Sequence, residues 1–193
     1  MSQNKMPVVD LSKSKSHWPV AVLLRRGFWT YVLEPVVRWW PKAFSPLRVA
    51  ALRLMGAQIG PRCLILPGVK VLMPWNLIME DHVAIGRHVD VYNFAPVTIR
   101  RQTVVSQGVY LCTGSHDYRQ PDMPLTYLPI TIGSECWLAA GAFVCPGVSI
   151  ADGVVIGARS VVTRSVTEAW SVHGGNPSVR IKARKMAPTD KPV

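Results

Sequence analysis

The chain lacks any long uninterrupted run of apolar residues. The stretch 16–47 is rich in Trp and Leu, but five charged residues interrupt it: Arg25, Arg26, Glu34, Arg38 and Lys42. Because a membrane-spanning helix needs about 20 consecutive apolar residues, none is predicted. The polar, basic start also lacks the apolar segment and the small-residue cleavage site of a secretory signal peptide. We therefore expect a cytoplasmic protein.

Cysteine is scarce, with four residues and no CxxC pair: Cys63, Cys112, Cys136 and Cys145. Each stands among aliphatic residues, where a free thiol packs as a small hydrophobic group. The spacing favours neither a disulfide framework nor a zinc-binding pair, so we expect reduced thiols. No neighbouring histidine and asparagine pattern marks Cys112 as a nucleophile.

Histidine is also scarce, and the five residues do not cluster. His82 and His88 are six residues apart, and no two histidines have the 18-residue spacing that would stack them in the repeat described below. A zinc site needs several converging imidazoles, so no metal is expected.

Acidic residues are half as numerous as basic ones, 11 against 22, which gives a net charge of +11. The excess lies at the two ends: residues 1–58 carry nine Lys or Arg against two acids, and residues 159–193 carry seven against two. A nucleic-acid-binding protein more often has a basic stripe on its folded body, so no nucleic-acid partner is expected. Basic ends suit a phosphate-bearing ligand or an anionic membrane surface better.

The sequence does contain a repeat of six residues that begins at Ile59. Aliphatic residues recur at this spacing in three runs: Ile59, Ile65, Val71, Leu77, Val83 and Val89; Ile99, Val105 and Leu111; Ile132, Leu138, Val144, Ile150, Ile156 and Val162. The phase slips within "VDVYNFAPVTI". A period of six with turn-forming glycines predicts a short strand and a corner per unit, and three units per 18-residue coil. The coils should stack as a triangular prism, with strands about 4.8 Å apart and room for about five coils.

Residues 59–182 resemble the hexapeptide-repeat acyltransferases, whose fold is a left-handed parallel β-helix. The period does not reveal the hand of the coil, so the resemblance supplies it. We therefore expect an all-β protein with this domain over residues 59–167. An N-terminal tail and helical cap over 1–58 and a C-terminal extension and tail over 168–193 should flank it.

Two helical segments are predicted before the repeat. "FSPLRVAALRLMG" indicates a helix with Ser45 as N-cap, Pro46 in its first turn and Gly56 just past its end. Its apolar face is expected to cover the open end of the prism and comprises Leu47, Ala51, Leu54 and Met55. A second helical face upstream, kinked or split at Pro35, comprises Trp29, Leu33, Val36, Val37 and Trp40. This face could pack on the prism or on a neighbouring subunit, or it could lie on a membrane surface.

The polar stretch "CTGSHDYRQPDMPL", residues 112–125, interrupts the repeat. Because residues 117–129 show no six-residue pattern, the loop 116–129 should project from a corner of the prism. Loops that leave a rigid scaffold often carry the chemistry. His116 lies at the base of this loop, and an imidazole can accept a proton from a hydroxyl near neutral pH. Asp117 could orient a neighbouring group or the substrate, or it could be an exposed loop carboxylate.

Three segments are similar to the sugar O-acetyltransferases: "TGSHDY" (113–118), "PITIGSECWLAAGAFVCPGVSIADGVVIGARSVVTRSV" (129–166) and "GGNPSVRIK" (174–182). This group includes the galactoside, maltose and nodulation-factor acetyltransferases, and the similarity is greatest to the colanic-acid-biosynthesis acetyltransferases. The resemblance implies transfer of acetyl from acetyl-CoA to a sugar hydroxyl, with His116 as general base and no acyl-enzyme. It also implies a homotrimer with its sites between subunits.

The small residues Ala140 and Ala158 are 18 apart, so they should stack at one edge of successive coils. Small side chains there would leave backbone groups open to an extended ligand, although plain corner packing is the alternative. The resemblance implies coenzyme A contacts at Trp137, Ala139, Ala140 and Ala158. By position in the basic C-terminal region, it implies phosphate contacts at Arg164, Arg180 and Lys182, for which solvated surface charge is the alternative. Asn93, in "VYNFAPV", resembles an acceptor-binding asparagine of the family.

We therefore expect an acetyl-CoA-dependent O-acetyltransferase in surface-polysaccharide biosynthesis, acting on a sugar or a glycolipid-linked acceptor. Peripheral contact of the N-terminal segment with the inner membrane face is a further expectation. One alternative is N-acetylation of an amino sugar, which the same base could support. The other is a trimeric membrane-docking module without catalysis.

Overall fold

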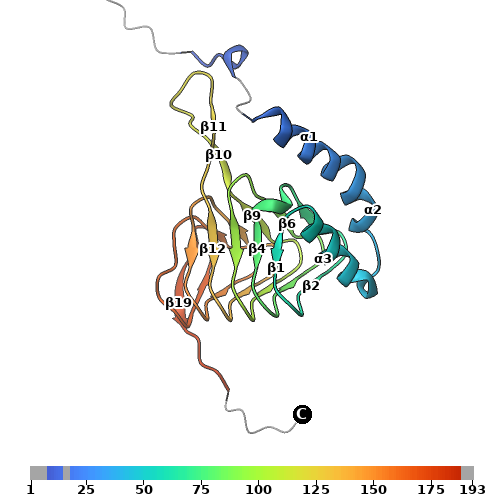
Figure 1. The fold of residues 1–193 in the computed structure, drawn as a ribbon. Coiled ribbons are helices and arrows are strands. Elements are labelled where there is room, and N and C mark those ends of the chain that lie inside the picture. Colours follow the sequence, from blue (N-terminus) through green and yellow to red (C-terminus); the bar gives the residue numbers. More distant parts are fainter. Residues whose placement is uncertain (1–7, 15–17, 188–193) are drawn as a thin grey trace, which may run out of the picture.

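The computed structural model describes residues 8–14 and 18–187, so the outer parts of both expected tails lie outside the described residues. A solenoid of short parallel strands forms the body, with helices at one end and a hairpin that projects from it (Figure 1). This arrangement confirms the predicted prism.

The strands of the prism form three faces. The first face contains β1 (Gln58–Ile59), β4 (Leu77–Met79), β7 (Val97–Ile99), β12 (Ile130–Ile132) and β15 (Ser149–Ile150). The second face contains β2 (Leu64–Ile65), β5 (Ala84–Ile85), β8 (Val104–Val105), β13 (Trp137–Leu138), β16 (Val155–Ile156) and β18 (Ser171–Gly174), to which β19 (Val179–Ala183) adds antiparallel. The third face contains β3 (Lys70–Val71), β6 (Asp90–Tyr92), β9 (Tyr110–Cys112), β14 (Phe143–Val144) and β17 (Val161–Val162).

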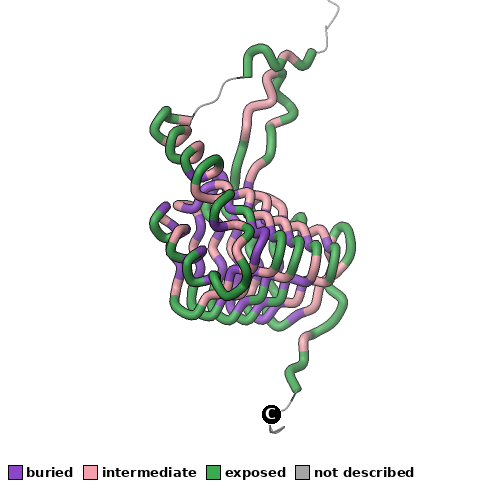
Figure 2. The backbone as a smooth tube through the Cα atoms, turned by 90° about the vertical axis from the view of Figure 1, so that its right-hand side faces the viewer, coloured by how far each residue is buried: buried purple, intermediate pink, exposed green. Residues whose placement is uncertain are grey.

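Aliphatic side chains fill the axis of the prism because each strand directs them inward. On the second face Ile65, Ile85, Val105, Leu138 and Ile156 stack in register, each at most 1% exposed. Burial of a side chain of this size contributes about 1.5–3 kcal/mol. Figure 2 shows the same alternation of buried and exposed positions along every coil. The repeat of six thus records one inward side chain per face of the prism.

The expected 18-residue coil holds only for the later coils. Ile59 pairs with Met79, 20 positions on, whereas Leu138 pairs with Ile156, 18 positions on. In the first coil the two additional residues belong to a 3₁₀ turn, η4 (Pro74–Asn76). The unbroken run of six predicted over 59–89 is therefore wrong at this turn. Strand β4 buries both Leu77 and Met79. The aliphatic residues therefore still recur every six positions in the sequence, although the coil is two residues longer.

The N-terminal helices pack along the prism. They comprise α1 (Val20–Phe28), a π-helical turn η2 (Trp29–Leu33) and α2 (Glu34–Arg38). Pro35 has no N–H to donate and so disturbs the regular ladder, and the wide turn directly precedes it. Trp29 is 2% exposed and its indole donates to the Val71 carbonyl at 2.6 Å. This contact favours packing on the prism for the predicted helical face. Of the residues predicted to form that face, only Val36 is exposed, at 55%.

Helix α3 (Ser45–Leu54) covers the first coil, and of its predicted face Met55 is buried and Ala51 packs against the core. Leu47 and Leu54 are exposed, and the buried residues are Ser45, Arg48, Val49, Leu52 and Met55. The Ser45 hydroxyl accepts from the Ile65 amide and is not the N-cap. The buried Arg48 guanidinium donates to three carbonyls, those of Val37, Trp40 and Ile65. A charged side chain is buried here because these oxygens satisfy its donors.

Part of the basic excess of residues 1–58 therefore has a structural use. Besides Arg48, three arginines donate to backbone oxygens: Arg25, Arg38 and Arg53. Arg38 and Arg53 each tie a helix to the first coil, and Arg25 ties α1 to the end of α3 at Met55. The charge count of this region consequently overstates the cations that remain free for a partner.

The interruption of the repeat is a hairpin. It consists of β10 (Gly114–His116) and β11 (Leu125–Tyr127), paired antiparallel, with an exposed turn between them (Figure 1). The hairpin leaves the prism after β9, where the chain would otherwise continue to the next coil. The predicted projection from a corner is therefore present, and its first strand begins before His116.

Candidate active site

His116 ends β10 and is exposed. Its Nδ1 lies 2.6 Å from the carbonyl oxygen of Met123 on the returning arm of the hairpin. Since a carbonyl can only accept, Nδ1 carries the proton of a neutral imidazole in this arrangement. Nε2 is then the unprotonated nitrogen, which can accept a proton from a substrate. The hairpin thus fixes the tautomer that a general base requires.

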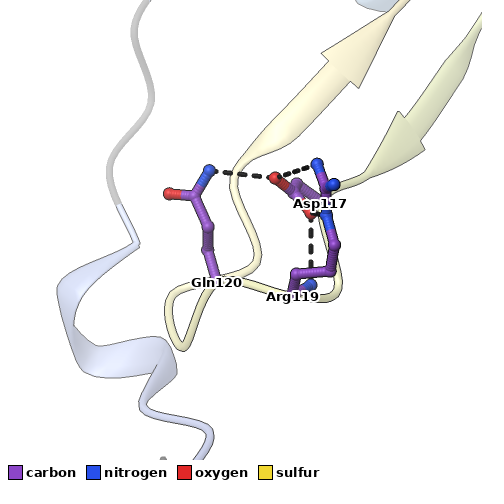
Figure 3. A network of polar contacts seen from close by, with 3 residues as sticks. All are labelled: Asp117, Arg119 and Gln120. Atoms are coloured by element: carbon purple, nitrogen blue, oxygen red, sulfur yellow. Dashed lines mark hydrogen bonds and ion pairs between the residues drawn. The ribbon is translucent and has the colours of Figure 1, made fainter.

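The turn of the hairpin is held by Asp117 (Figure 3). Its carboxylate accepts from the Arg119 guanidinium at 2.8 and 3.1 Å and from the Gln120 amide at 3.0 Å. These bonds hold the pKa of Asp117 well below its usual range, with Arg119 the largest contributor. The carboxylate is therefore engaged within the turn, and its side chain, 15% exposed, differs from the exposed loop carboxylate of the alternative.

A cavity of about 400 Å³ lies between the N-terminal helices and the third face of the prism. Glu34 and Arg38 line it from the helix, and Lys70, Asp90 and Tyr92 line it from the strands. Burial raises the pKa of both carboxyl groups, while the two cations act in the opposite direction. The cavity therefore brings together several hydrogen-bonding groups of both signs.

This cavity and the hairpin share one face of the molecule. Tyr92 pairs in register with Cys112, two residues before the start of β10. Burial also raises the pKa of Tyr92, and it raises that of Tyr110 to about 12, so both phenols remain neutral hydrogen-bonding groups. Sequence analysis missed this cavity, although the outward positions 90 and 92 of one strand, both polar, were a signal for it.

Asn93 does not face the cavity. Its side chain is fully buried, accepts from the Met73 amide at 2.9 Å and donates to the Met73 carbonyl at 2.8 Å. The side chain thus closes the corner beside η4. This position is incompatible with the acceptor-binding role that the sequence suggested for Asn93.

The alanines stack as expected at the corner between the second and third faces. The Ala140 carbonyl accepts from the Arg159 amide of the next coil at 2.9 Å. Among the described residues, the amide N–H groups of Ala140 and Ala158 make no hydrogen bond, so both can serve an extended ligand. Ala139, by contrast, is 7% exposed and its amide is bonded to Ile156.

Trp137 stands beside this corner on the outer side of β13. It is 47% exposed, and its indole donates to the Ser106 hydroxyl at 2.9 Å. The hydrogen bond therefore fixes the orientation of the indole ring, and part of the ring remains exposed to solvent. This geometry fits either a wall of a ligand groove or a packed surface aromatic.

The basic C-terminal residues differ in their freedom. Arg164 and Lys182 are both exposed, but Arg164 comes just after β17 of the third face, whereas Lys182 lies in β19 at the edge of the second face. Arg180 forms an ion pair with Glu168 at 2.6 Å. Arg184 donates to the carbonyls of Glu135 and Gly153, so it fastens β19 to the prism. One chain therefore does not gather these cations at a single point.

Within residues 8–14 and 18–187, no three His, Cys, Asp or Glu side chains are grouped so that they could hold a metal ion. Burial raises the pKa of the Cys112 thiol, which makes it a poor nucleophile. No helix in the described part of the chain is long and apolar enough to span a membrane.

Comparisons with known proteins identify the family and the fold of the chain. Residues 129–164 match the family described as bacterial transferase hexapeptide (six repeats). The solved maltose O-acetyltransferase of Clostridium difficile 630 superposes with a TM-score of 0.78 at 22% identity, over 87% of this chain and 90% of that one. A galactoside acetyltransferase solved with coenzyme A gives 0.78 at 21% identity, over 88% and 86%. These likenesses establish the left-handed β-helical fold.

The sequence comparison is closer. The chain is 43% identical over 156 residues to the Escherichia coli K12 protein named "Putative colanic acid biosynthesis acetyltransferase WcaF", covering 81% of this chain and 85% of that protein. The match thus covers more than two thirds of both proteins. The chain therefore belongs to the hexapeptide-repeat acetyltransferases.

Proposed function

We propose that this protein transfers an acetyl group from acetyl-CoA to a sugar hydroxyl, with His116 as the general base. The observation that carries the proposal is the bond from Nδ1 of His116 to the Met123 carbonyl, which leaves Nε2 free as a proton acceptor on an exposed hairpin. Family membership supports acetyl transfer as the reaction. A positioned base of this kind contributes about 10²–10⁴-fold to a rate.

In this reaction Nε2 of His116 removes the proton of the acceptor hydroxyl while the hydroxyl oxygen attacks the carbonyl carbon of the thioester. The carbon–sulfur bond then breaks, and the acetyl group remains on the sugar as an ester. The departing thiolate takes the proton back from the imidazolium. No acyl-enzyme is required, in keeping with a Cys112 thiol whose pKa is raised by burial.

The two substrates would occupy different parts of the surface. The cavity beside Glu34, Asp90 and Tyr92 offers carboxylate and phenol groups that suit the hydroxyls of a sugar. The corner at Ala140 and Ala158 offers free amides to the pantetheine arm of acetyl-CoA, beside Trp137.

Arg164, Arg180 and Lys182 are the proposed phosphate contacts, with the Arg180 contact in competition with Glu168. Since Arg164 and Lys182 belong to different faces of the prism, we propose that the site forms in the groove between neighbouring subunits of a homotrimer.

The test is acetyl transfer to a panel of sugars and the matching amino sugars, with acetyl-CoA as donor and the purified full chain as enzyme. We expect an alkali-labile ester as the product, identified by mass spectrometry before and after mild base. An alkali-stable amide on an amino sugar would instead establish N-acetylation. Absence of acetyl-CoA binding by calorimetry would favour a structural module.

We also propose that the N-terminal helices contact the anionic inner membrane face in the cytoplasm, where a glycolipid-linked acceptor would be met. An exposed apolar stripe runs along them at intervals of four residues: Val20, Leu24, Phe28, Val32 and Val36, each at least 49% exposed. The single acid of this segment, Glu34, faces the cavity.

Sedimentation with vesicles of anionic and of neutral lipid tests this contact. We expect binding to the anionic vesicles alone and its loss in Leu24→Glu/Phe28→Glu. Equal binding by this variant would contradict it.

A further inference from the structure

The N-terminal segment touches the hairpin at two places. Near the turn, the Asp10 amide donates to the Pro121 carbonyl at 2.8 Å. At the base, Trp18 packs on aromatic side chains of the prism and of β11. The segment that contains the 3₁₀ turn η1 (Leu11–Lys13) lies beside the hairpin turn in Figure 1 and Figure 3. His116 lies between these two contacts along the hairpin.

Three rings form the contact at the base. The Trp18 centroid lies 5.9 Å from that of Phe94 and 5.5 Å from that of Tyr127, with interplanar angles of 22° and 23°. The Phe94 and Tyr127 centroids are 6.5 Å apart, so the three rings make a triangle. Each such aromatic pair stabilises beyond its buried area. The triangle thus joins the N-terminal segment, a corner of the prism and the second strand of the hairpin.

The first strand of the hairpin belongs to the same contact. A Cβ atom on Gly114 would approach the Phe94 ring to 2.8 Å, so only glycine lets the ring lie against this backbone. Gly114 pairs with Tyr127, and His116 pairs with Leu125. Directly paired residues, and those two positions along, share one side of an antiparallel ribbon. His116 and Tyr127 therefore lie on the same side, and Trp18 packs there on Tyr127.

The bonds of Asp117 and His116 hold the turn of the hairpin together, but they do not attach the hairpin to the prism. Three residue pairs make up its ladder, and a two-stranded hairpin on its own is only marginally stable. His116 and the side chains of Tyr118, Tyr127 and Leu128 are exposed. The position of the imidazole relative to the prism therefore depends on contacts from outside the hairpin.

We propose that Trp18 is a positioning residue for acetyl transfer, which acts through Tyr127 and Phe94 to hold the hairpin and with it His116. This inference rests on the proposed function, because it assigns Trp18 a role through the proposed base. It gives the segment before α1 a part in activity that its sequence, far from the repeat, did not indicate.

The test compares Trp18→Ala and Trp18→Phe in the full chain, with Tyr31→Ala as the matched control. Tyr31 is an aromatic residue of the turn η2 that follows α1, and it is 83% exposed. We expect Trp18→Ala to lower kcat about 10- to 100-fold, since small displacements of catalytic groups have effects of this size. The KM for acetyl-CoA should not change. Trp18→Phe should restore most of the rate, and Tyr31→Ala should match the wild type.

Hydrogen exchange supplies a readout independent of turnover. In Trp18→Ala, the amides of 114–116 and 125–127 should exchange faster, while those of β13 and β16 remain as in the wild type. In the turnover assay, the kcat of the double variant Trp18→Ala/Tyr127→Ala should be no lower than that of Tyr127→Ala, because both side chains act through one contact.

The outcomes separate this proposal from the proposed function. If Trp18→Ala keeps the wild-type kcat while His116→Ala is inactive, the positioning role is wrong and the base assignment stands. If His116→Ala is fully active, the base assignment itself is wrong. A raised KM for the sugar, with unchanged kcat and unchanged exchange, would show that Trp18 binds the acceptor and would overturn the positioning role.

Discussion

The prism and the hairpin are held in opposite ways. Along the prism, each inner strand pairs with the coils before and after it. Side chains such as Leu111 and Ile132, which flank the hairpin, are completely buried. The hairpin has one short ladder, and Tyr118 near its turn is 79% exposed. The stacked coils provide a rigid frame, whereas the candidate base lies on the element with the least support of its own. Contacts from the N-terminal segment make up part of this difference.

The largest expected effect lies in the prism. Leu138→Ala should lower the free energy of unfolding by about 2–5 kcal/mol, because the stacked coils cannot collapse around the lost side chain. Tyr118→Ala in the hairpin should change it by about 0.5 kcal/mol at most, as for an exposed residue without special contacts. Urea unfolding at a fixed protein concentration measures both. Equal losses would remove the contrast between the two regions.

A pair of corner glycines gives an intermediate effect. Gly108 and Gly153 both have positive φ, +67° and +70°. A Cβ atom at Gly108 meets nothing within 4 Å, whereas at Gly153 it approaches the Trp170 ring to 2.5 Å. Gly108→Ala should cost about 1–2 kcal/mol for the left-handed backbone alone. Gly153→Ala should cost about 1 kcal/mol more, because the ring must move.

Thermal and urea unfolding of the two glycine variants, measured side by side, give the comparison. If they are equally stable, the Trp170 side chain moves aside at no cost, and its segment belongs with the weakly held parts of the molecule.

The smallest effect concerns the attachment of the N-terminal helices. Burial raises the pKa of Glu34 above its usual value of 4.5. The folded state therefore binds this proton more tightly than the unfolded state, and stability falls as pH rises from about 4.5 through the raised pKa. Glu34→Gln removes this loss, so the variant should unfold at a slightly higher urea concentration than the wild type at pH 7.

At pH 4 the difference between the two proteins should shrink, because Glu34 is then largely protonated in both states. A variant that is less stable at pH 7 would show that Arg38 and Lys70 hold Glu34 as a stabilising anion.

The sequence predicted the prism because burial at the axis admits little except aliphatic side chains. It did not predict the longer first coil, because the aliphatic residues on either side of η4 still fall six apart in the sequence. It predicted the buried face of α3 only in part, because apolarity was equated with burial. Arg48 is buried with its donors satisfied, while Leu47 and Leu54 face outward.

The candidate site was predicted in part for similar reasons. His116 stood out because it broke an apolar repeat. The group that orients it is a backbone carbonyl at Met123, which leaves no mark in a sequence. Asn93 was misjudged because a polar residue in a turn of the repeat can serve the coil itself as readily as a ligand.

The most direct test of the account is the turnover of His116→Ala with acetyl-CoA and the best sugar of the panel. The side chain is exposed, so the variant should fold and bind acetyl-CoA as the wild type does, which unfolding and calorimetry can verify. We predict a kcat lower by about 10²–10⁴-fold. Turnover at the wild-type rate by a folded variant that binds acetyl-CoA normally would contradict the assignment of His116 as the base.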